Sequence, residues 1–335
     1  MAINQMQNKH LRVRADRLSP LHLNVIISSS HRNWVLGILA RELKNQLVKF
    51  QTSLVYIPQS RRDVRSPNGF LRLPKADVNI YLHHELALTA ISKKWMRQEE
   101  TNVLFFTHLA GDTTKIGMLK NHFQLIIVNN SSTKRSLGQL GFDEKLIHVL
   151  HNPIDPIFRT YQRDKTKLRD IIFVSNYTQR KRPDLIVEVV QRCHDFTFTL
   201  LGRGWNGGQE LAQIANLPNF NYREFNFETY PYELSKHKVF CSLSDVEGGP
   251  VPLLEALVLG LNVVVTDTGS ARDLLPSSIH STIIPVNPEV DAIIESLTLA
   301  VQGMKNNFIP KDEFFYPGFA EQMELLIDTE RFKNS

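Results

Sequence analysis

The sequence has few cysteines, no long apolar run and no segment resembling a signal peptide. Two cysteines among 335 residues, Cys193 and Cys241, make neither a disulfide framework nor a zinc site. We therefore expect two buried, reduced thiols. No apolar run approaches the length of a membrane span, and the polar, basic first 20 residues lack the apolar core of a secretion signal. These absences favour a cytoplasmic protein.

Several catalytic motifs are also missing from the sequence. It contains no G-x-S-x-G, no H-E-x-x-H and no G-x4-G-K-[ST], which argues against α/β-hydrolases, zinc peptidases and P-loop nucleotidases. The run His83-His84-Glu85 could suggest a metal, but no further ligand cluster supports it. We therefore expect no metal and no bound cofactor.

The charge of the chain is divided unequally. Residues 1–160 carry 22 Lys and Arg against 11 Asp and Glu, and residues 161–335 carry 17 against 23. A basic half favours an anionic partner, such as an acidic bilayer, a lipid diphosphate or an acidic glycan, although a solvated surface without a partner explains it equally well. Nucleic acid is not expected, because no recognition motif accompanies the charge. Arg61–Arg65 and Lys93–Arg97 are candidate contacts with an anionic membrane.

Short β-like runs alternate with helical patterns along the whole chain. We expect strands at 23–27, 53–57, 77–82, 102–107, 124–129, 170–174, 196–201, 238–243 and 262–266. We expect helices at 33–49, 133–140, 183–194, 209–215, 252–259 and 317–331, the second of them capped by Ser131 or Ser132 and ended by Gly141. This alternation is typical of parallel, doubly wound sheets, and its restart in the second half predicts two α/β domains.

The boundary between the domains is expected at His151–Pro156, where two prolines interrupt any helix or strand. We predict one domain over 1–157 and a second over 158–312. Residues 313–335 are expected to form a C-terminal helix that packs back toward the first domain.

The most informative stretch is Ser244–Leu257, where a strand, a short loop and a helix follow one another. Gly248 and Gly249 let the backbone approach a ligand closely, and Pro252 suits the first position of a helix. The helix N-terminus is a ready site for a diphosphate. Carboxylates beside an anion need partners of their own, and sugar hydroxyls would supply them.

The carboxylates Glu247 and Glu255 in this stretch resemble the glutamate-x7-glutamate signature of retaining GT-B glycosyltransferases, especially family 4. The resemblance is strong over roughly 145–275 and weak over 1–100. It implies an α/β GT-B fold, two Rossmann-like domains facing each other across a cleft. It also implies that Glu247 contacts the transferred sugar and Glu255 the ribose, with backbone groups of four residues near the donor phosphates: Gly248, Gly249, Pro250 and Val251.

The loop after the first strand of the second domain carries basic residues that the resemblance assigns to the diphosphate. Cations are needed there because negative charge grows on the leaving phosphate. Lys181 is the best match and Arg180 is close behind, with Asn176 also on the donor side. The family usually has Gly-Arg where this chain has Ser175-Asn176, so the choice of clamp among Arg180, Lys181 and Arg182 stays open.

Three further positions complete the expected site. Gly202 begins a G-x-G-x-x-G run, but the run follows the second strand of its domain, so we interpret it as a close-approach turn near the donor and not as an NAD site. His108 matches a histidine that faces the transferred sugar, although a lone histidine is as often a surface or core residue. The first loop, with Ser30, His31 and Asn33, is expected on the acceptor side, since ligands bind outside the carboxyl ends of parallel strands.

Together these features predict a hexosyltransferase of class EC 2.4 that moves a sugar from an NDP-sugar to a hydroxyl of a glycan or lipid-linked glycan. The resemblance implies retention of configuration and a role in surface polysaccharide biosynthesis, with peripheral contact at the inner face of the membrane. The alternatives are an NDP-sugar epimerase or a phosphorylase, a non-catalytic glycan- or partner-binding protein with the same fold, and a nucleic-acid-binding protein that uses the basic first half.

Overall fold

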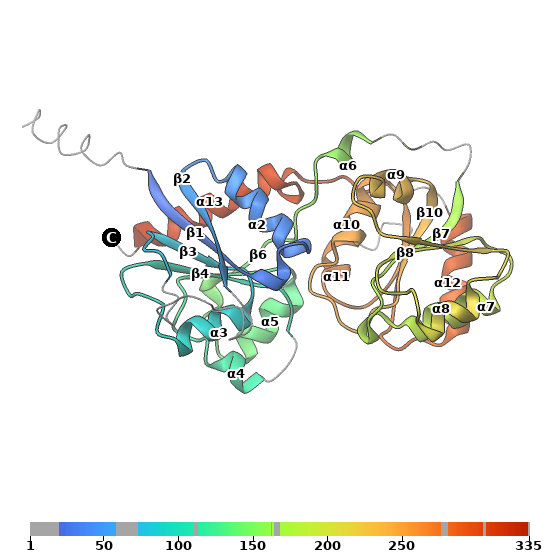
Figure 1. The fold of residues 1–335 in the computed structure, drawn as a ribbon, viewed down its shortest axis with the longest axis horizontal. Coiled ribbons are helices and arrows are strands. Elements are labelled where there is room, and N and C mark those ends of the chain that lie inside the picture. The colour runs from blue at the N-terminus through green and yellow to red at the C-terminus, as the bar shows by residue number, and fades with distance from the viewer. Residues whose placement is uncertain are drawn as a thin grey trace, which may run out of the picture.

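A computed structural model describes residues 20–57, 73–109, 113–161, 163, 168–275, 281–303 and 306–333. It contains two α/β domains side by side, each built around a six-stranded parallel sheet (Figure 1). The expected contact segment Arg61–Arg65 lies outside the described residues.

The N-terminal domain has the strand order β2-β1-β3-β4-β5-β6. Its strands are β1 (Leu21–Ser28), β2 (Phe50–Ile57), β3 (Val78–Tyr81), β4 (Thr101–Phe106), β5 (Leu125–Val128) and β6 (Ile147–Val149). Its helices are η1 (Ser29–His31), α2 (Val35–Gln46), α3 (His84–Ser92), α4 (Thr113–Gly117), α5 (Ser131–Gln139) and η2 (Glu144–Leu146). Central strands such as β3 and β5 are buried at every residue, as expected for a parallel sheet that helices cover on both faces.

The C-terminal domain has the strand order β12-β11-β10-β7-β8-β9. Its strands are β7 (Arg169–Val174), β8 (Phe198–Gly202), β9 (Phe220–Glu224), β10 (His237–Ser242), β11 (Asn262–Thr266) and β12 (Thr282–Ile284). Its helices are α6 (Ile157–Thr160), η4 (Gln179–Lys181), α7 (Pro183–Arg192), α8 (Gln209–Ile214), α9 (Tyr230–Ser235), α10 (Val251–Val258), α11 (Ala271–Leu274) and α12 (Val290–Gln302). Two separate apolar clusters lie on the two faces of this sheet.

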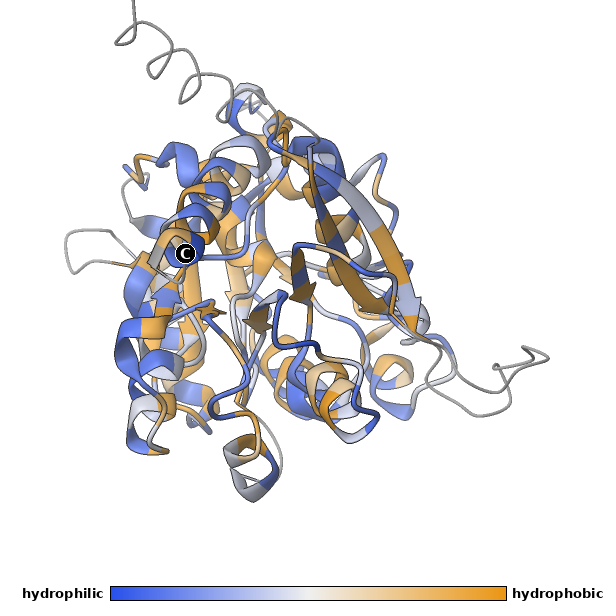
Figure 2. Ribbon diagram, turned by 90° about the vertical axis from the view of Figure 1, so that its left-hand side faces the viewer, coloured by the Kyte–Doolittle hydropathy of each residue, from blue (hydrophilic) through white to orange (hydrophobic). Residues whose placement is uncertain are grey.

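The last helix, α13 (Tyr316–Lys333), returns to the N-terminal domain (Figure 1). Its residues Phe319, Met323 and Ile327 are buried in one cluster with Leu39 and Leu43 of α2. In the view of Figure 2 the apolar strands lie inside a shell of more polar helical surface. The chain therefore crosses between the domains twice, once before α6 and once before α13.

The two crossings lie side by side. The backbone N–H of Ile154 donates to the carbonyl of Phe314 at 2.9 Å, and that of Tyr316 donates to the carbonyl of Ile154 at 3.3 Å. The guanidinium of Arg159 lies 4.1 Å from the centre of the Phe315 ring. The connection between the domains thus consists of two short segments of the chain that are hydrogen-bonded to each other.

Each of the nine expected strands is present, with its ends within three residues of the expected ones. The sequence did not reveal three strands, β6, β9 and β12, or six α-helices, α3, α4, α6, α9, α11 and α12. The expected cap of α5 was wrong: its N-cap is Asn130, whose side-chain oxygen accepts from the N–H of Thr133 at 2.7 Å. The prediction for the cysteines is confirmed, because both are free and buried.

Candidate active site

The crevice of the C-terminal sheet lies between β7 and β10, where the strand order reverses. Ligands of doubly wound sheets bind at the carboxyl ends of the strands at such a point. The loops that follow β7 and β10 meet there, and the N–H of Asp245 donates to the carbonyl of Arg180 at 2.9 Å. A small pocket at this place is lined by Ser175, Lys181 and Ser244, among others.

Glu247 is buried between two cations in this crevice. Its Oε1 accepts from Arg180 Nη1 at 3.0 Å and also from Lys181 Nζ. Burial alone would raise the pKa of the Glu247 carboxyl, but Lys181 and Arg180 overcome this effect and lower the pKa below its usual range. Glu247 is therefore ionised at neutral pH, and one carboxylate is shared by two cations. The pair retains positive charge for an anionic ligand.

Arg182 is directed to other partners. It adopts a left-handed backbone conformation with φ of 52°, and its guanidinium binds Asp184 at 2.8 Å, Asp245 at 3.1 Å and Asn287 at 2.6 Å. Of the three basic residues that the sequence left open, only the two before it contact Glu247.

Glu255 lies in α10 and is fully buried. Tyr230 of α9 donates a hydrogen bond to its Oε2 at 2.5 Å. Burial raises the pKa of Glu255 to about 8; the hydrogen bond from Tyr230 acts in the opposite direction, and Asp155 adds to the rise. Sequence reasoning missed Tyr230, because α9 was not expected and nothing in the sequence pairs it with α10.

The two glycines after Glu247 allow the loop to touch the N-terminal domain. A Cβ on Gly248 would lie 1.7 Å from the carbonyl oxygen of Thr107, and one on Gly249 would lie 3.0 Å from Asn129 Cβ. Asn130 Nδ2 donates to the carbonyl of Gly248 at 2.7 Å, and Asn152 Nδ2 donates to that of Gly249 at 2.6 Å. The cleft is closed at this loop, and close approach of the backbone serves the domain contact.

Helix α10 begins immediately after this loop. Pro250 is its N-cap and Val251 its first residue. The sequence predicted Pro252 at the first helical position, and the structure has it at the second. No side chain caps this end. Pro250 and Pro252 have no N–H, and that of Leu253 donates to the carbonyl of Pro250 at 3.1 Å. The first turn of α10 therefore offers a ligand in the crevice the N–H of Val251.

Gly202 is the last residue of β8 and packs against the loop that follows β7. A Cβ there would lie 1.8 Å from the carbonyl oxygen of Ser175, which also accepts from the indole of Trp205 at 2.7 Å. The side chain of Asn176 accepts from the N–H of Arg203 at 3.0 Å. The turn after β8 therefore packs directly against the loop that carries the cations.

On the facing side, four histidines gather at the carboxyl ends of β1, β3 and β4. Ring centres of His83 and His84 are 4.4 Å apart, those of His83 and His108 are 5.7 Å apart, and those of His31 and His83 are 5.9 Å apart. The Cβ of His108 would lie 3.2 Å from a Cβ on Gly248, so the cluster adjoins the loop after β10.

The other residues expected on the acceptor side lie at the surface. Ser30 is exposed in η1, with its hydroxyl 2.9 Å from that of Ser28. Asn33 is exposed in the turn before α2. Sequence reasoning placed neither His83 nor His84 in a ligand site. The sequence shows these two histidines directly after an apolar strand, a position typical of ligand-binding residues, but they were interpreted from the sequence only as possible metal ligands.

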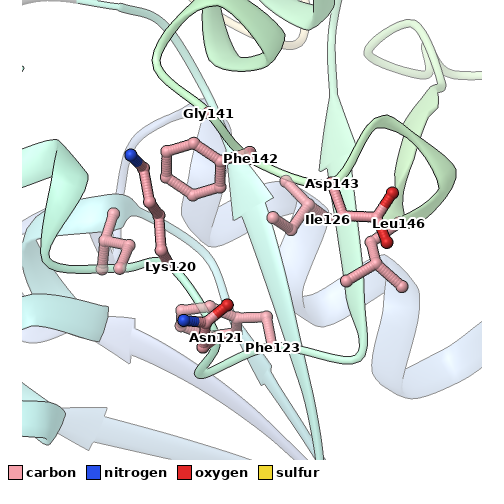
Figure 3. A pocket seen from close by; sticks show the side chains of 9 residues that line it. Lys120, Asn121, Phe123, Ile126, Gly141, Phe142, Asp143 and Leu146 are labelled. Atoms are coloured by element: carbon pink, nitrogen blue, oxygen red, sulfur yellow. The ribbon is translucent and has the colours of Figure 1, made fainter.

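Other candidate sites do not join this crevice. Within the described part of the chain, no group of three or more His, Cys, Asp or Glu side chains is arranged to hold a metal ion. A small pocket containing Lys120 and Phe142 opens at the amino ends of β5 and β6, the opposite edge of the sheet (Figure 3). No helix among the described residues is long and apolar enough to cross a bilayer.

Part of the segment Lys93–Arg97, expected to contact a membrane, packs within the N-terminal domain instead. Trp95 and Met96 pack against the core of the N-terminal domain, and Arg97 forms an ion pair of 2.6 Å with Glu100, a buried residue.

Residues 156–309 match the family model described as glycosyl transferases group 1. The matched residues begin at the start of α6 and end after α12. The chain is 24% identical over 148 residues to the O-antigen biosynthesis glycosyltransferase WbnH of Escherichia coli, a match that covers 44% of this chain and 43% of that protein. The chain thus matches less than half the length of this curated relative.

Solved structures of glycosyltransferases share the two-domain arrangement. HepE of Anabaena, in complex with UDP and glucose, aligns with a TM-score of 0.67 at 14% identity and covers 94% of this chain and 99% of that one. Sucrose-phosphate synthase of Thermosynechococcus elongatus aligns with a TM-score of 0.72 at 11% identity over 94% and 100%. Together with the two parallel sheets, these likenesses confirm the GT-B fold.

Proposed function

We propose that this chain is a glycosyltransferase that moves a sugar from a nucleoside diphosphate sugar to a hydroxyl of a glycan or lipid-linked glycan. The arrangement that carries the proposal is Glu247, ionised and paired with Lys181 and Arg180 at the switch point of the C-terminal sheet, directly across from His108. It combines a carboxylate for sugar hydroxyls with cations for phosphate.

We expect the donor to bind in this crevice with its diphosphate against the basic residues. Lys181, Arg180 and the N–H of Val251 at the start of α10 hold the diphosphate and stabilise the charge that grows on it as the glycosidic bond breaks. Glu247 accepts hydrogen bonds from the transferred sugar, and Glu255 accepts them from the ribose. The UDP in the HepE complex and the family match support a nucleotide-sugar donor.

The acceptor then approaches from the N-terminal domain, past His108. Transfer proceeds with retention of configuration, and the leaving phosphate receives the proton of the acceptor hydroxyl. The phosphate charge is met by Lys181, Arg180 and the helix terminus, so no metal ion is required. The O-antigen function named for WbnH supports a role in surface polysaccharide biosynthesis.

Thermal unfolding with UDP, GDP, ADP and CMP tests the donor site. A ligand at one hundred times its dissociation constant adds about 2.7 kcal/mol of stability, so one of the four nucleotides should raise the melting temperature clearly. Glu255→Ala should weaken that rise. Glu295→Gln, which alters an exposed carboxyl on α12, should leave it unchanged. No rise with any nucleotide contradicts the proposal.

Peripheral membrane contact is a further part of the proposal. Lys93 and Lys94 are exposed beside the packed Trp95, which leaves cations, and not the indole, to face acidic lipids. Flotation with phosphatidylserine vesicles should show binding at low salt that is lost at high salt. Absence of binding at both salt concentrations refutes this part alone.

A further inference from the structure

Arg182 has a backbone conformation that its place in the chain disfavours. It follows η4 directly and precedes Pro183, the first residue of α7. Its φ of 52° and ψ of 61° lie in the left-handed region, which residues with a side chain rarely adopt, and a residue before proline prefers an extended backbone. Such a conformation persists where the surrounding structure enforces it, and it is concentrated at functional sites.

The guanidinium of Arg182 joins three loops at the carboxyl ends of strands in the C-terminal sheet. Its Nη1 donates to Asp245 Oδ1 at 3.1 Å and to Asn287 Oδ1 at 2.6 Å. Its Nε and Nη2 donate to the Asp184 carboxylate at 3.1 and 2.8 Å. Asp184 follows β7, Asp245 follows β10 and Asn287 follows β12. Because a guanidinium is planar and presents its donors at fixed angles, this side chain ties the three loops together.

These contacts leave Arg182 little capacity to bind a ligand. A guanidinium has five N–H donors, and the contacts use four of them, one on Nε, two on Nη1 and one on Nη2. Two carboxylates balance its charge, and only 17% of the side chain is exposed. The role of Arg182 therefore differs from that of the two basic residues before it.

The turn that Arg182 closes carries both cations of the proposed donor site. The N–H of Asp245 donates to the carbonyl of Arg180 at 2.9 Å, so Asp245 is held by Arg180 through its backbone and by Arg182 through its side chain. The same turn places Arg180 and Lys181 on the carboxylate of Glu247. Without the guanidinium, the turn would lose its side-chain connection to the loop after β10 and could move relative to Glu247.

We propose that Arg182 is a positioning residue, which holds η4 against the loop after β10 so that Arg180 and Lys181 are aligned on Glu247 before a diphosphate binds. The inference rests on the proposed function, because that function assigns the two cations to the diphosphate. Side chains that are already oriented lose less conformational entropy when a ligand binds. The ties of Arg182 thus raise the affinity of a site that Arg182 itself does not contact.

Titration of the Glu247 carboxyl by 13C NMR of the whole chain tests this positioning without a ligand. Lys181 and Arg180 lower the pKa of this carboxyl below its usual range, so a loss of their alignment should raise it. Ser244 and His108, which also face Glu247, stay unchanged in every variant below.

Two substitutions of Arg182 separate its shape from its charge. Arg182→Gly removes the side chain and suits the left-handed backbone, so the turn can form without strain. Arg182→Lys keeps the charge but lacks the planar fork that reaches three acceptors. Both variants should raise the pKa of Glu247. A rise in Arg182→Gly alone would show that Arg182 acts only through its charge and would overturn the inference, as would no rise in either variant.

Arg192→Ala is the matched control. It removes an equal charge from the far end of α7, where Arg192 pairs with Glu188 and Asp291. The pKa of Glu247 should stay at its wild-type value in this variant. A rise equal to that of Arg182→Gly would show that any lost charge on α7 has this effect, and the inference would fail.

Binding of UDP, GDP and ADP connects the positioning to the donor. The dissociation constant of the diphosphate that binds wild type should rise about tenfold in Arg182→Gly and Arg182→Lys, as expected when one charge-assisted hydrogen bond is no longer held. It should not change in Arg192→Ala. The matching nucleoside lacks the phosphates and should bind wild type and variants equally. An equal loss of nucleoside binding would indicate general disruption of the crevice and would overturn the inference.

The two measurements separate this inference from the proposed donor site. If no nucleotide binds wild type but the pKa of Glu247 rises in both Arg182 variants, the donor proposal fails and the positioning of the cations stands. If a nucleotide binds wild type and both variants equally, and the pKa of Glu247 does not change, the positioning fails and the donor proposal stands.

Discussion

Replacing Glu255 by Gln should stabilise the ligand-free protein in a way that depends on pH. The pKa of this buried carboxyl is about 8 in the fold, against an ordinary value of 4.5. Below pH 4.5 it is protonated in both the folded and the unfolded chain, and its ionisation has no effect on stability. Between pH 4.5 and 8 the unfolded chain releases the proton while the folded chain keeps it, so stability falls as pH rises through this window.

The size of the effect follows from the pKa shift. At pH 7 the unfolded carboxyl is ionised and the folded one is mostly protonated, a difference of about 2.5 pKa units, or about 3 kcal/mol at 1.36 kcal/mol per unit. Gln cannot ionise and still accepts the hydrogen bond of Tyr230. Glu255→Gln should therefore add about 3 kcal/mol to the free energy of unfolding of the C-terminal domain at pH 7, which is roughly 6–12 °C in melting temperature.

Thermal unfolding of wild type and Glu255→Gln at pH 5, 7 and 8 measures this difference. The gap in melting temperature should be small at pH 5 and widen toward pH 8, and Glu295→Gln should show no such trend. The same Glu255→Gln protein should bind nucleotide more weakly above pH 8, where Glu255 of the wild type is ionised and offers the ribose a carboxylate that Gln lacks. A gap that does not change with pH would refute the reasoning on the buried carboxyl.

Three further changes test the rest of the site. Lys181→Met should raise the pKa of Glu247 and slow sugar transfer about 100-fold or more, by analogy with the loss of one charge-stabilising group; an unchanged kcat would contradict its role. Gly248→Ala places a Cβ 1.7 Å from the Thr107 carbonyl, so the domains should separate and the radius of gyration measured by X-ray scattering should rise; a wild-type radius would show that the loop shifts instead. Asn130→Ser keeps the cap of α5 and loses only the bond to Gly248, so it should melt above Asn130→Ala, whose loss of the cap costs about 1 kcal/mol; equal melting temperatures would show that the cap contributes nothing.

The sequence predicted the strands well because parallel strands buried on both faces are nearly continuous apolar runs. It failed where this signal weakens. The edge strand β9 reads Phe-Asn-Tyr-Arg-Glu and has its last two residues exposed, and β6 and β12 have three residues each. Such strands are defined by their hydrogen bonds to a neighbour, which local composition does not encode.

For the candidate site, residues close together in the sequence were easier to predict than residues brought together by the fold. The roles assigned to Glu247 and Glu255 follow from one continuous motif, and they stay predictions. The bond from Asn152 to Gly249 joins residues 97 positions apart, and that from Tyr230 to Glu255 needs two helices at a particular angle. Neither spacing nor residue type signals such contacts.

The return of α13 has a practical consequence for engineering. The N-terminal domain of this molecule is encoded by two separate segments, since Phe319 and Met323 complete a core begun by Leu39 of α2. A chimera that exchanges only the first 150 residues for those of a relative would pack a foreign sheet against the native helix α13. The apolar side chains of α13 would then not match the core that they fill. An exchange of the whole N-terminal domain therefore requires α13 to be transplanted together with the N-terminal segment.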